Sequence, residues 1–77
     1  MELELFVEKF AEEFDDTPVE EFSADTVFKD LDEWSSLTAL AIIAMIDEEF
    51  EVLLTGNDMR KSTKIIDLYD LIISKLP

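Results

Sequence analysis

Apolar residues recur at helical spacing near the start of the chain. Within residues 2–14 the intervals follow the i, i+3, i+4, i+7 pattern, and glutamates occupy the opposite face, which predicts an amphipathic helix. Pro18 follows this segment and ends it, because proline has no N–H to donate and the residue before it avoids helical angles. The apolar positions of this first helix are Leu3, Phe6, Val7, Phe10 and Phe14.

Residues 15–35 have no sustained period, yet they carry large apolar side chains. Such a segment is too apolar for a free linker, so the sequence predicts a long loop that is packed on the core. Trp34, at the end of this loop, is either a docking residue or a lid over the core, and we favour the lid because an aromatic side chain next to a small core usually packs on it. The apolar residues of the loop are Val19, Phe22, Val27, Phe28, Leu31 and Trp34.

Three further helical segments follow the loop. Ser35 and Ser36 are both good N-cap residues for a second helix that ends near Phe50. Gly56 then leads into a short helical turn over residues 58–61. A final helix is predicted to begin at Ser62 or Thr63 and to end before Pro77; its apolar residues are Ile65, Ile66, Leu68, Tyr69, Ile72, Ile73 and Leu76.

The pattern predicts an all-α fold, an antiparallel four-helix bundle with a short third helix and a long first loop. Residues 1–77 form a single domain, since 77 residues are near the lower limit for one hydrophobic core. No cysteine is present, so no disulfide supports this core. No strand pattern or internal repeat is visible.

Composition restricts the function. The chain has 20 acidic and six basic residues, a formal charge of −14, and no His or Cys. Nucleic-acid binding requires clustered Lys and Arg, so we expect no nucleic-acid partner and instead partners with basic surfaces. Without His or Cys the chain lacks the usual general base, thiol nucleophile and zinc ligands, so we expect neither an enzyme nor a metal site.

Other features bear on location and association. The longest apolar run, residues 39–46, is too short to span a bilayer, and the N-terminus has no basic segment that would mark a signal peptide. We therefore expect a cytoplasmic protein without membrane insertion. We also expect it to be a monomer.

The second helix is apolar around its whole circumference. One complete stripe, predicted to face the core, consists of Ala39, Ile42, Ile43, Ile46 and Phe50. A helix with apolar residues left over is either buried on all sides or shows a second face to a partner, and burial on all sides is hard to arrange in so small a domain. We therefore predict a partner-binding surface, with an acidic edge at its end; it consists of Leu37, Leu40, Ala41, Ala44, Asp47, Glu48 and Glu51.

Residues 28–50, with the sequence FKDLDEWSSLTALAIIAMIDEEF, resemble the prosthetic-group site of the acyl carrier proteins. In that family the serine of an Asp-Ser-Leu motif is esterified to 4'-phosphopantetheine, derived from coenzyme A, whose thiol holds the acyl cargo. The matching serine is Ser36, which Leu37 follows, and residues 63–69 also fit the family's order. Ser35 stands where the family usually has Asp.

The resemblance implies a discrete carrier with the acyl-carrier-protein fold. It would hold acyl groups as thioesters on phosphopantetheine at Ser36 and present them to basic-surfaced acyl-transferring or synthase enzymes of fatty-acid, polyketide or related biosynthesis. A phosphopantetheinyl transferase would attach the group and supply the catalytic base. The alternative is an unmodified acidic carrier-like domain with an interaction or regulatory role, because Ser35 lacks the charge that a transferase could recognise.

Overall fold

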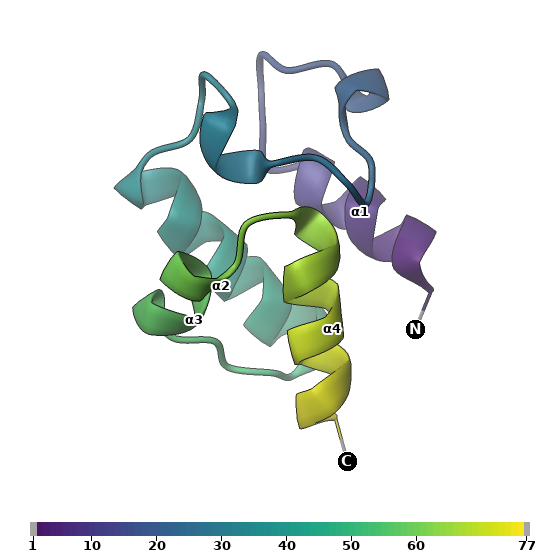
Figure 1. Cartoon of the computed structure of the whole chain (residues 1–77), viewed down its shortest axis with the longest axis vertical. Helices are drawn as coiled ribbons and strands as arrows, with labels where there is room; N and C mark the ends of the chain where they lie inside the picture. Colours follow the sequence, from purple (N-terminus) through teal and green to yellow (C-terminus); the bar gives the residue numbers. More distant parts are fainter. Residues whose placement is uncertain (1, 77) are drawn as a thin grey trace.

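Four α-helices and two short 3-10 helices make up the computed structural model, which describes residues 2–76 (Figure 1). The α-helices are α1 (Leu3–Ala11), α2 (Ser36–Phe50), α3 (Gly56–Lys61) and α4 (Ile65–Lys75), and the 3-10 helices are η1 (Val19–Glu21) and η2 (Phe28–Asp30). The described residues form no β-strand; Val27 and Lys64 form an isolated antiparallel bridge. The predicted all-helical fold, with its short third helix and long first loop, is confirmed.

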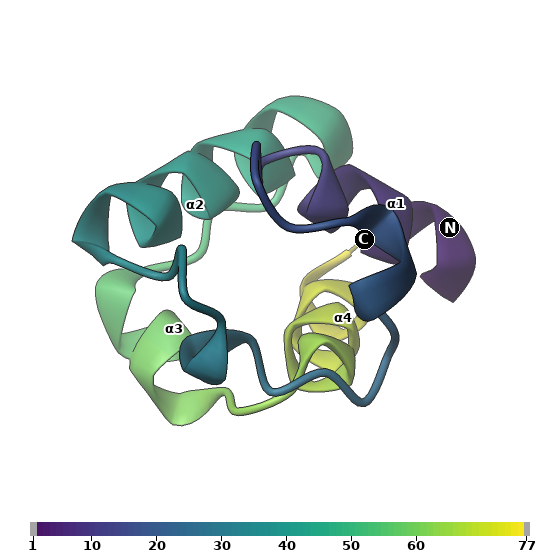
Figure 2. The same cartoon turned by 90° about the horizontal axis from the view of Figure 1, so that it is seen from above.

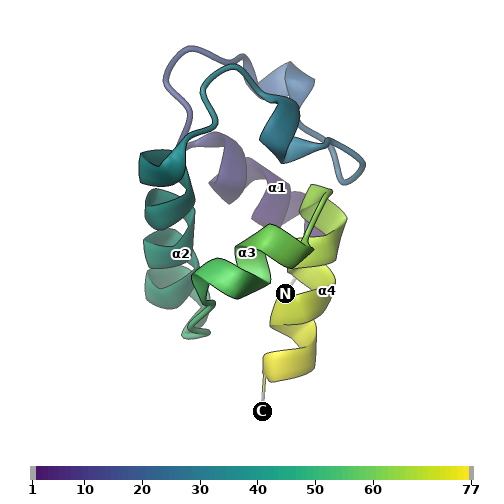
Figure 3. The same cartoon turned by 60° about the vertical axis from the view of Figure 1, so that its left-hand side comes forward.

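The helices surround the core in an arrangement that is not antiparallel throughout. Seen from above, α1, α2, α3 and α4 stand around the centre, and the first loop crosses over them (Figure 2). In Figure 3, α2 and α4 both begin near this loop and run away from it. Residues 51–64, which include α3, carry the chain back between them. The expected antiparallel arrangement therefore does not hold for α2 and α4.

The first loop is fixed to the core by side chains and by backbone hydrogen bonds. Phe22 and Phe28 are buried. At the start of α4, the N–H of Ile65 donates to the carbonyl of Thr26 at 3.1 Å, and the N–H of Ile66 donates to that of Ala24 at 2.9 Å. The prediction of a loop packed on the core is thus confirmed. These bonds also satisfy N–H groups that the first turn of a helix leaves unpaired.

A second contact joins the two ends of the same loop. The Glu33 carboxylate accepts hydrogen bonds from the Thr17 hydroxyl and from the N–H of Asp16, the latter at 3.1 Å. These donors favour the charged form of the carboxylate, so the Thr17 hydroxyl, together with the backbone N–H, holds the pKa of Glu33 below its ordinary value. The loop therefore closes on itself just before α2 begins.

The core is rich in aromatic rings, and Phe10 of α1 lies at its centre. Trp34 is half-buried and packs on this core as the predicted lid: its indole lies 4.8 Å from the Phe28 ring and 6.5 Å from the Phe10 ring, measured between centroids. The rings that contact Phe10 are those of Phe6, Phe14, Phe22, Phe28 and Trp34.

The boundaries of two helices differ from the prediction for local reasons. Helix α1 ends at Ala11 rather than at residue 14, because the following residues form i to i+3 hydrogen bonds, such as that from the N–H of Phe14 to the carbonyl of Ala11. Helix α3 begins at Gly56, earlier than expected, because Thr55 and Asp58 form a capping box with bonds of 2.9 and 3.1 Å.

Helix α4 begins at Ile65, later than expected. The Ser62 hydroxyl donates to the carbonyl of Asp58 at 3.0 Å and so completes the end of α3 instead of capping α4. The Asp67 carboxylate accepts from the N–H groups of Thr63 and Lys64, at 3.0 and 2.8 Å, which places the helix start after Lys64. These two backbone donors lower the pKa of Asp67.

The buried face of α2 is also rotated from the predicted one. Ile42, Met45 and Ile46 are buried, whereas Ala39, Ile43 and Phe50 are only half-buried. Ile43 and Phe50 of the predicted stripe pack against the edge of the core, Ala39 is half-buried, and the buried Met45 was not predicted.

Substitution of Asp67 by Ala should lower the free energy of unfolding by about 1 kcal/mol at pH 7, because two backbone N–H groups lose their acceptor. Since the pKa of Asp67 is lowered in the folded state, its stabilisation is present above the unfolded-state pKa and is lost as the pH falls through the folded-state pKa. The difference between Asp67→Ala and the wild type should thus narrow below about pH 4. Urea unfolding at several pH values measures it.

Asp70→Ala is the matched control, because Asp70 is exposed on the same helix and its loss changes the net charge equally. It should change stability by no more than about 0.5 kcal/mol. Equal losses in the two variants at pH 7 would contradict a capping role for Asp67.

Candidate functional site

Ser35 and Ser36, at the start of α2, have different structural roles. Ser35 has an extended backbone and is the N-cap: its hydroxyl oxygen accepts from the N–H of Thr38 at 3.3 Å, and its carbonyl accepts from the N–H of Ala39 at 2.9 Å. The Thr38 hydroxyl donates to the carbonyl of Glu33 at 2.8 Å and ties the helix to the preceding loop. Ser36 is the first helical residue. Of the two serines predicted as N-cap residues, the structure assigns the cap to Ser35.

Ser36 is exposed, and its hydroxyl makes no hydrogen bond with any part of the chain that the structure describes. The N–H groups of Ser36 and Leu37 likewise make none within residues 2–76. Such unpaired donors, together with the positive end of the helix dipole, favour an anion at this helix end. The Ser36 hydroxyl is therefore free to form a covalent bond, and its surroundings suit a negatively charged substituent.

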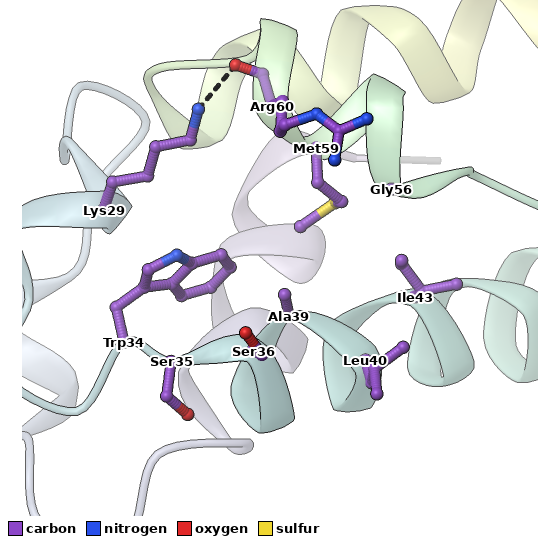
Figure 4. A pocket seen from close by; sticks show the side chains of 10 residues that line it. All are labelled: Lys29, Trp34, Ser35, Ser36, Ala39, Leu40, Ile43, Gly56, Met59 and Arg60. Carbon is purple, nitrogen blue, oxygen red and sulfur yellow. Dashed lines mark hydrogen bonds between the residues drawn. The ribbon is translucent and has the colours of Figure 1, made fainter.

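A pocket of about 530 Å³ adjoins Ser36 between α2 and α3 (Figure 4). Ala39 and Ile43 of α2 lie across it from Met59 of α3, and the Trp34 indole closes one end. Above them the Lys29 ammonium donates to the carbonyl of Arg60 at 2.7 Å. The lining residues are Lys29, Trp34, Ser35, Ser36, Ala39, Leu40, Ile43, Gly56, Met59 and Arg60.

The apolar part of the predicted partner-binding surface is largely open to solvent. Leu37 is 79% exposed and Leu40 is 62% exposed, and their spacing of three residues on one helix places them on the same face. Ala44 is exposed, whereas Ala41 is half-buried. Leu53, in the connection to α3, is 69% exposed and was not predicted.

The acidic edge lies at the C-terminal end of α2, where Asp47, Glu48 and Glu51 are all exposed. Carboxylates there oppose the negative end of the helix dipole, and the last turn has no basic residue. Glu51 has a φ of 58°, a left-handed conformation that favours glycine. A salt bridge of 3.2 Å between Lys9 and Glu49 offsets part of this unfavourable charge.

Sequence reasoning missed the far wall of the pocket. Lys29, Met59 and Arg60 come from η2 and α3, and only the fold brings them next to α2. The one available signal was Met59, an apolar residue within the otherwise polar segment of residues 56–61.

No known protein family, curated protein or solved structure matches this chain. Within residues 2–76, every helix is too short or too polar to span a lipid bilayer. The same residues contain no group of three or more acidic side chains placed to hold a metal ion.

The exposed and buried faces of α2 should respond differently to a charge. Leu40→Glu should change the free energy of unfolding by no more than about 0.5 kcal/mol, since Leu40 already faces solvent. Ile42→Glu should unfold the domain, because an unpaired buried charge costs about 3–5 kcal/mol. Thermal unfolding followed by circular dichroism compares them. If Leu40→Glu melts as early as Ile42→Glu, this face belongs to the core.

Proposed function

We propose that this chain is a carrier protein of the acyl-carrier type, in which Ser36 bears 4'-phosphopantetheine and the thiol of that group holds an acyl cargo. The proposal includes the acyl-carrier-like arrangement of the helices. It rests on the residue pattern around Ser36 and on the geometry of the helix that Ser36 begins.

One observation carries the proposal. Ser35 accepts the capping hydrogen bond at the head of α2, so Ser36 is left exposed with an uncommitted hydroxyl. A serine that acts only as a helix cap would accept a hydrogen bond from the first turn, as Ser35 does. Ser36 has no such task, and its availability suits a residue that another enzyme modifies.

The residues present fit the phosphopantetheine group. A phosphodiester on Ser36 would lie beside the unpaired N–H groups of Ser36 and Leu37, at the positive end of a helix of 15 residues. Such an arrangement favours an anion by about 0.3–1 kcal/mol at an exposed site. When bound, the group supplies a thiol, which this chain lacks because it has no cysteine.

The attachment needs no catalytic group from the carrier. The Ser36 oxygen forms a bond to the phosphorus of coenzyme A that carries the pantetheine chain, and the bond from that phosphorus to the bridging oxygen of the pyrophosphate breaks. The nucleotide half of coenzyme A leaves with that oxygen. The hydroxyl proton passes to a base of the transferase, which explains how a chain without His can be modified.

The surface next to Ser36 suits docking to basic enzymes. Leu37 and Leu40 offer an apolar patch, and Asp47, Glu48 and Glu51 continue it with negative charge. A partner with an apolar centre and basic rim would be complementary in both respects. The same surface would serve an unmodified interaction domain, so modification at Ser36 distinguishes the two functions.

The acidic end of α2 also supports a functional role, because it opposes local stability. Carboxylates crowd the wrong end of the helix dipole, and Glu51 occupies a conformation that glycine would adopt more easily. Natural sequences depart from local preference mainly where function requires it. Docking to basic partners would account for carboxylates at this end of the helix.

The proposal is tested by incubating the protein with coenzyme A, magnesium and a broad-specificity phosphopantetheinyl transferase. We expect the intact mass to rise by one phosphopantetheinyl group. Ser36→Ala should abolish the gain and leave the helical circular dichroism nearly unchanged, because Ser35 still caps α2.

Ser35→Ala serves as the matched control. It removes the cap, with a loss of stability of about 1 kcal/mol, but it retains the acceptor hydroxyl and should still gain mass. If modification persists in Ser36→Ala and disappears in Ser35→Ala, Ser35 is the modified residue and the assignment to Ser36 is wrong. If the wild type gains no mass and still binds basic proteins, the chain is an unmodified interaction domain.

Glu51→Gly should make the domain more stable and the carrier less effective. Relief of the left-handed conformation and loss of a charge at the helix end should together raise the free energy of unfolding by up to about 1 kcal/mol. Association with the transferase should weaken, since an acidic docking residue is gone. Glu51→Gln, which keeps the side chain and removes the charge, should weaken association equally but stabilise less. A loss of stability in Glu51→Gly would contradict this account.

A further inference from the structure

The pocket beside Ser36 differs in charge from the rest of the molecule. The chain has 20 acidic and six basic residues, so acids are expected on most of its surface. Two of the basic residues, Lys29 and Arg60, line this pocket, and no acidic residue does. Although the domain as a whole is strongly acidic, this pocket is a small concave region with positive charge.

Both cations have donors to spare. Within residues 2–76, the only ion pair closer than 4.0 Å joins Lys9 and Glu49. Lys29 gives one of its three N–H donors to the carbonyl of Arg60, and the Arg60 guanidinium forms no hydrogen bond with the described part of the chain. A guanidinium with all its donors free is well suited to bind a carboxylate, and the Lys29 ammonium adds a second positive charge to the lining of the same pocket.

The remaining walls of the pocket are mainly apolar. The Trp34 indole and the side chains of Ala39, Leu40, Ile43 and Met59 provide them. Met59 is a flexible side chain that adapts to ligands of different shape. A pocket with apolar walls and two cations at one side is complementary to a ligand with a carbon chain and one negative end.

We propose that this pocket binds a small amphipathic carboxylate, with the acid on Lys29 and Arg60 and the carbon chain against Trp34, Ile43 and Met59. In a carrier, such a ligand is an acyl cargo that ends in a free carboxylate, a dicarboxylic acid held as a monothioester. That assignment of the source rests on the proposed function, whereas the pocket's preference for a carboxylate does not.

The position of the cations decides which end of the cargo they contact. Figure 4 shows Lys29 and Arg60 across the pocket from Ser36. The phosphodiester of the prosthetic group would be bonded to Ser36 itself, where the N–H groups of α2 lie. The two cations are thus placed for a second negative charge at the far end of the carried chain.

The first experiment uses the unmodified protein and three free probes of equal chain length: octanoate, octanol and octylammonium. Binding is followed at about 0.1 M salt by the fluorescence of Trp34, the only tryptophan, and by NMR shifts of Met59 and Arg60. Octanoate should bind about three- to tenfold more tightly than octanol, and octylammonium most weakly.

Lys29→Gln with Arg60→Gln should remove the preference for octanoate over octanol. Lys61→Gln is the matched control: Lys61 neighbours Arg60 on α3 but does not line this pocket, so the preference should remain. All variants should remain folded, because the substituted side chains are exposed; loss of the bond from Lys29 to the carbonyl of Arg60 should lower the melting temperature of the double variant only slightly.

The second experiment loads the pantetheine thiol with a glutaryl or a pentanoyl group, which differ only in the terminal carboxylate. The glutaryl form should shift the resonances of Met59 and Arg60 more strongly, and Arg60→Gln should abolish the difference. A mass gain at Ser36 must precede this comparison. If no mass gain occurs, the proposed carrier function fails, while the free-probe experiment still decides the pocket's preference.

The outcomes separate the two sources of the carboxylate. A preference for octanoate without a difference between the loaded forms identifies a site for a free acid, and a difference between the loaded forms identifies the cargo. Equal binding of octanoate and octanol, together with equal shifts in the two loaded forms, would overturn the proposal.

Discussion

The packing of the long first loop around Phe10 is the contact on which the rest of the structure depends. The ring of Phe10 contacts the rings of Phe22 and Phe28 in the loop and of Trp34 at the end of the loop. A domain of 77 residues without disulfides has little other material for a core. Because Trp34 immediately precedes the capping Ser35, the same cluster also fixes where α2 starts and how Ser36 is presented.

Helix α2 satisfies two requirements with its two faces. Ile42, Met45 and Ile46 supply the core contacts, so the opposite face is not needed for folding. The exposed leucines and the acidic end are unfavourable for an isolated domain, since they leave apolar surface in water and place carboxylates at the negative end of the helix dipole. Burial of the opposite face offsets this unfavourable free energy. The exposed surface that results is compatible with the docking that we propose.

The charges of this molecule act differently on an anion at long range and at short range. The net charge of −14 repels other anions at a distance, but salt at physiological strength screens charges beyond about 8 Å. Within the pocket, Lys29 and Arg60 would act on the proposed anion at contact distance, where salt screens charges less. An acidic protein can therefore contain a site for an anion, provided that the nearest charges are positive.

The sequence by itself determined the helical segments, the loop packed on the core, the capping Ser35 and the spare face of α2, because these follow from local spacing and local hydrogen bonds. Tertiary structure alone decided the rest. Met45 is buried and Ile43 only half-buried because α1 and α3 contact α2 from directions that the periodicity does not specify. The start of α4 is held by bonds from the N–H groups of Ile65 and Ile66 to carbonyls of the first loop. The pocket joins Lys29 to Arg60 across 31 positions of the chain, a contact that no local pattern encodes.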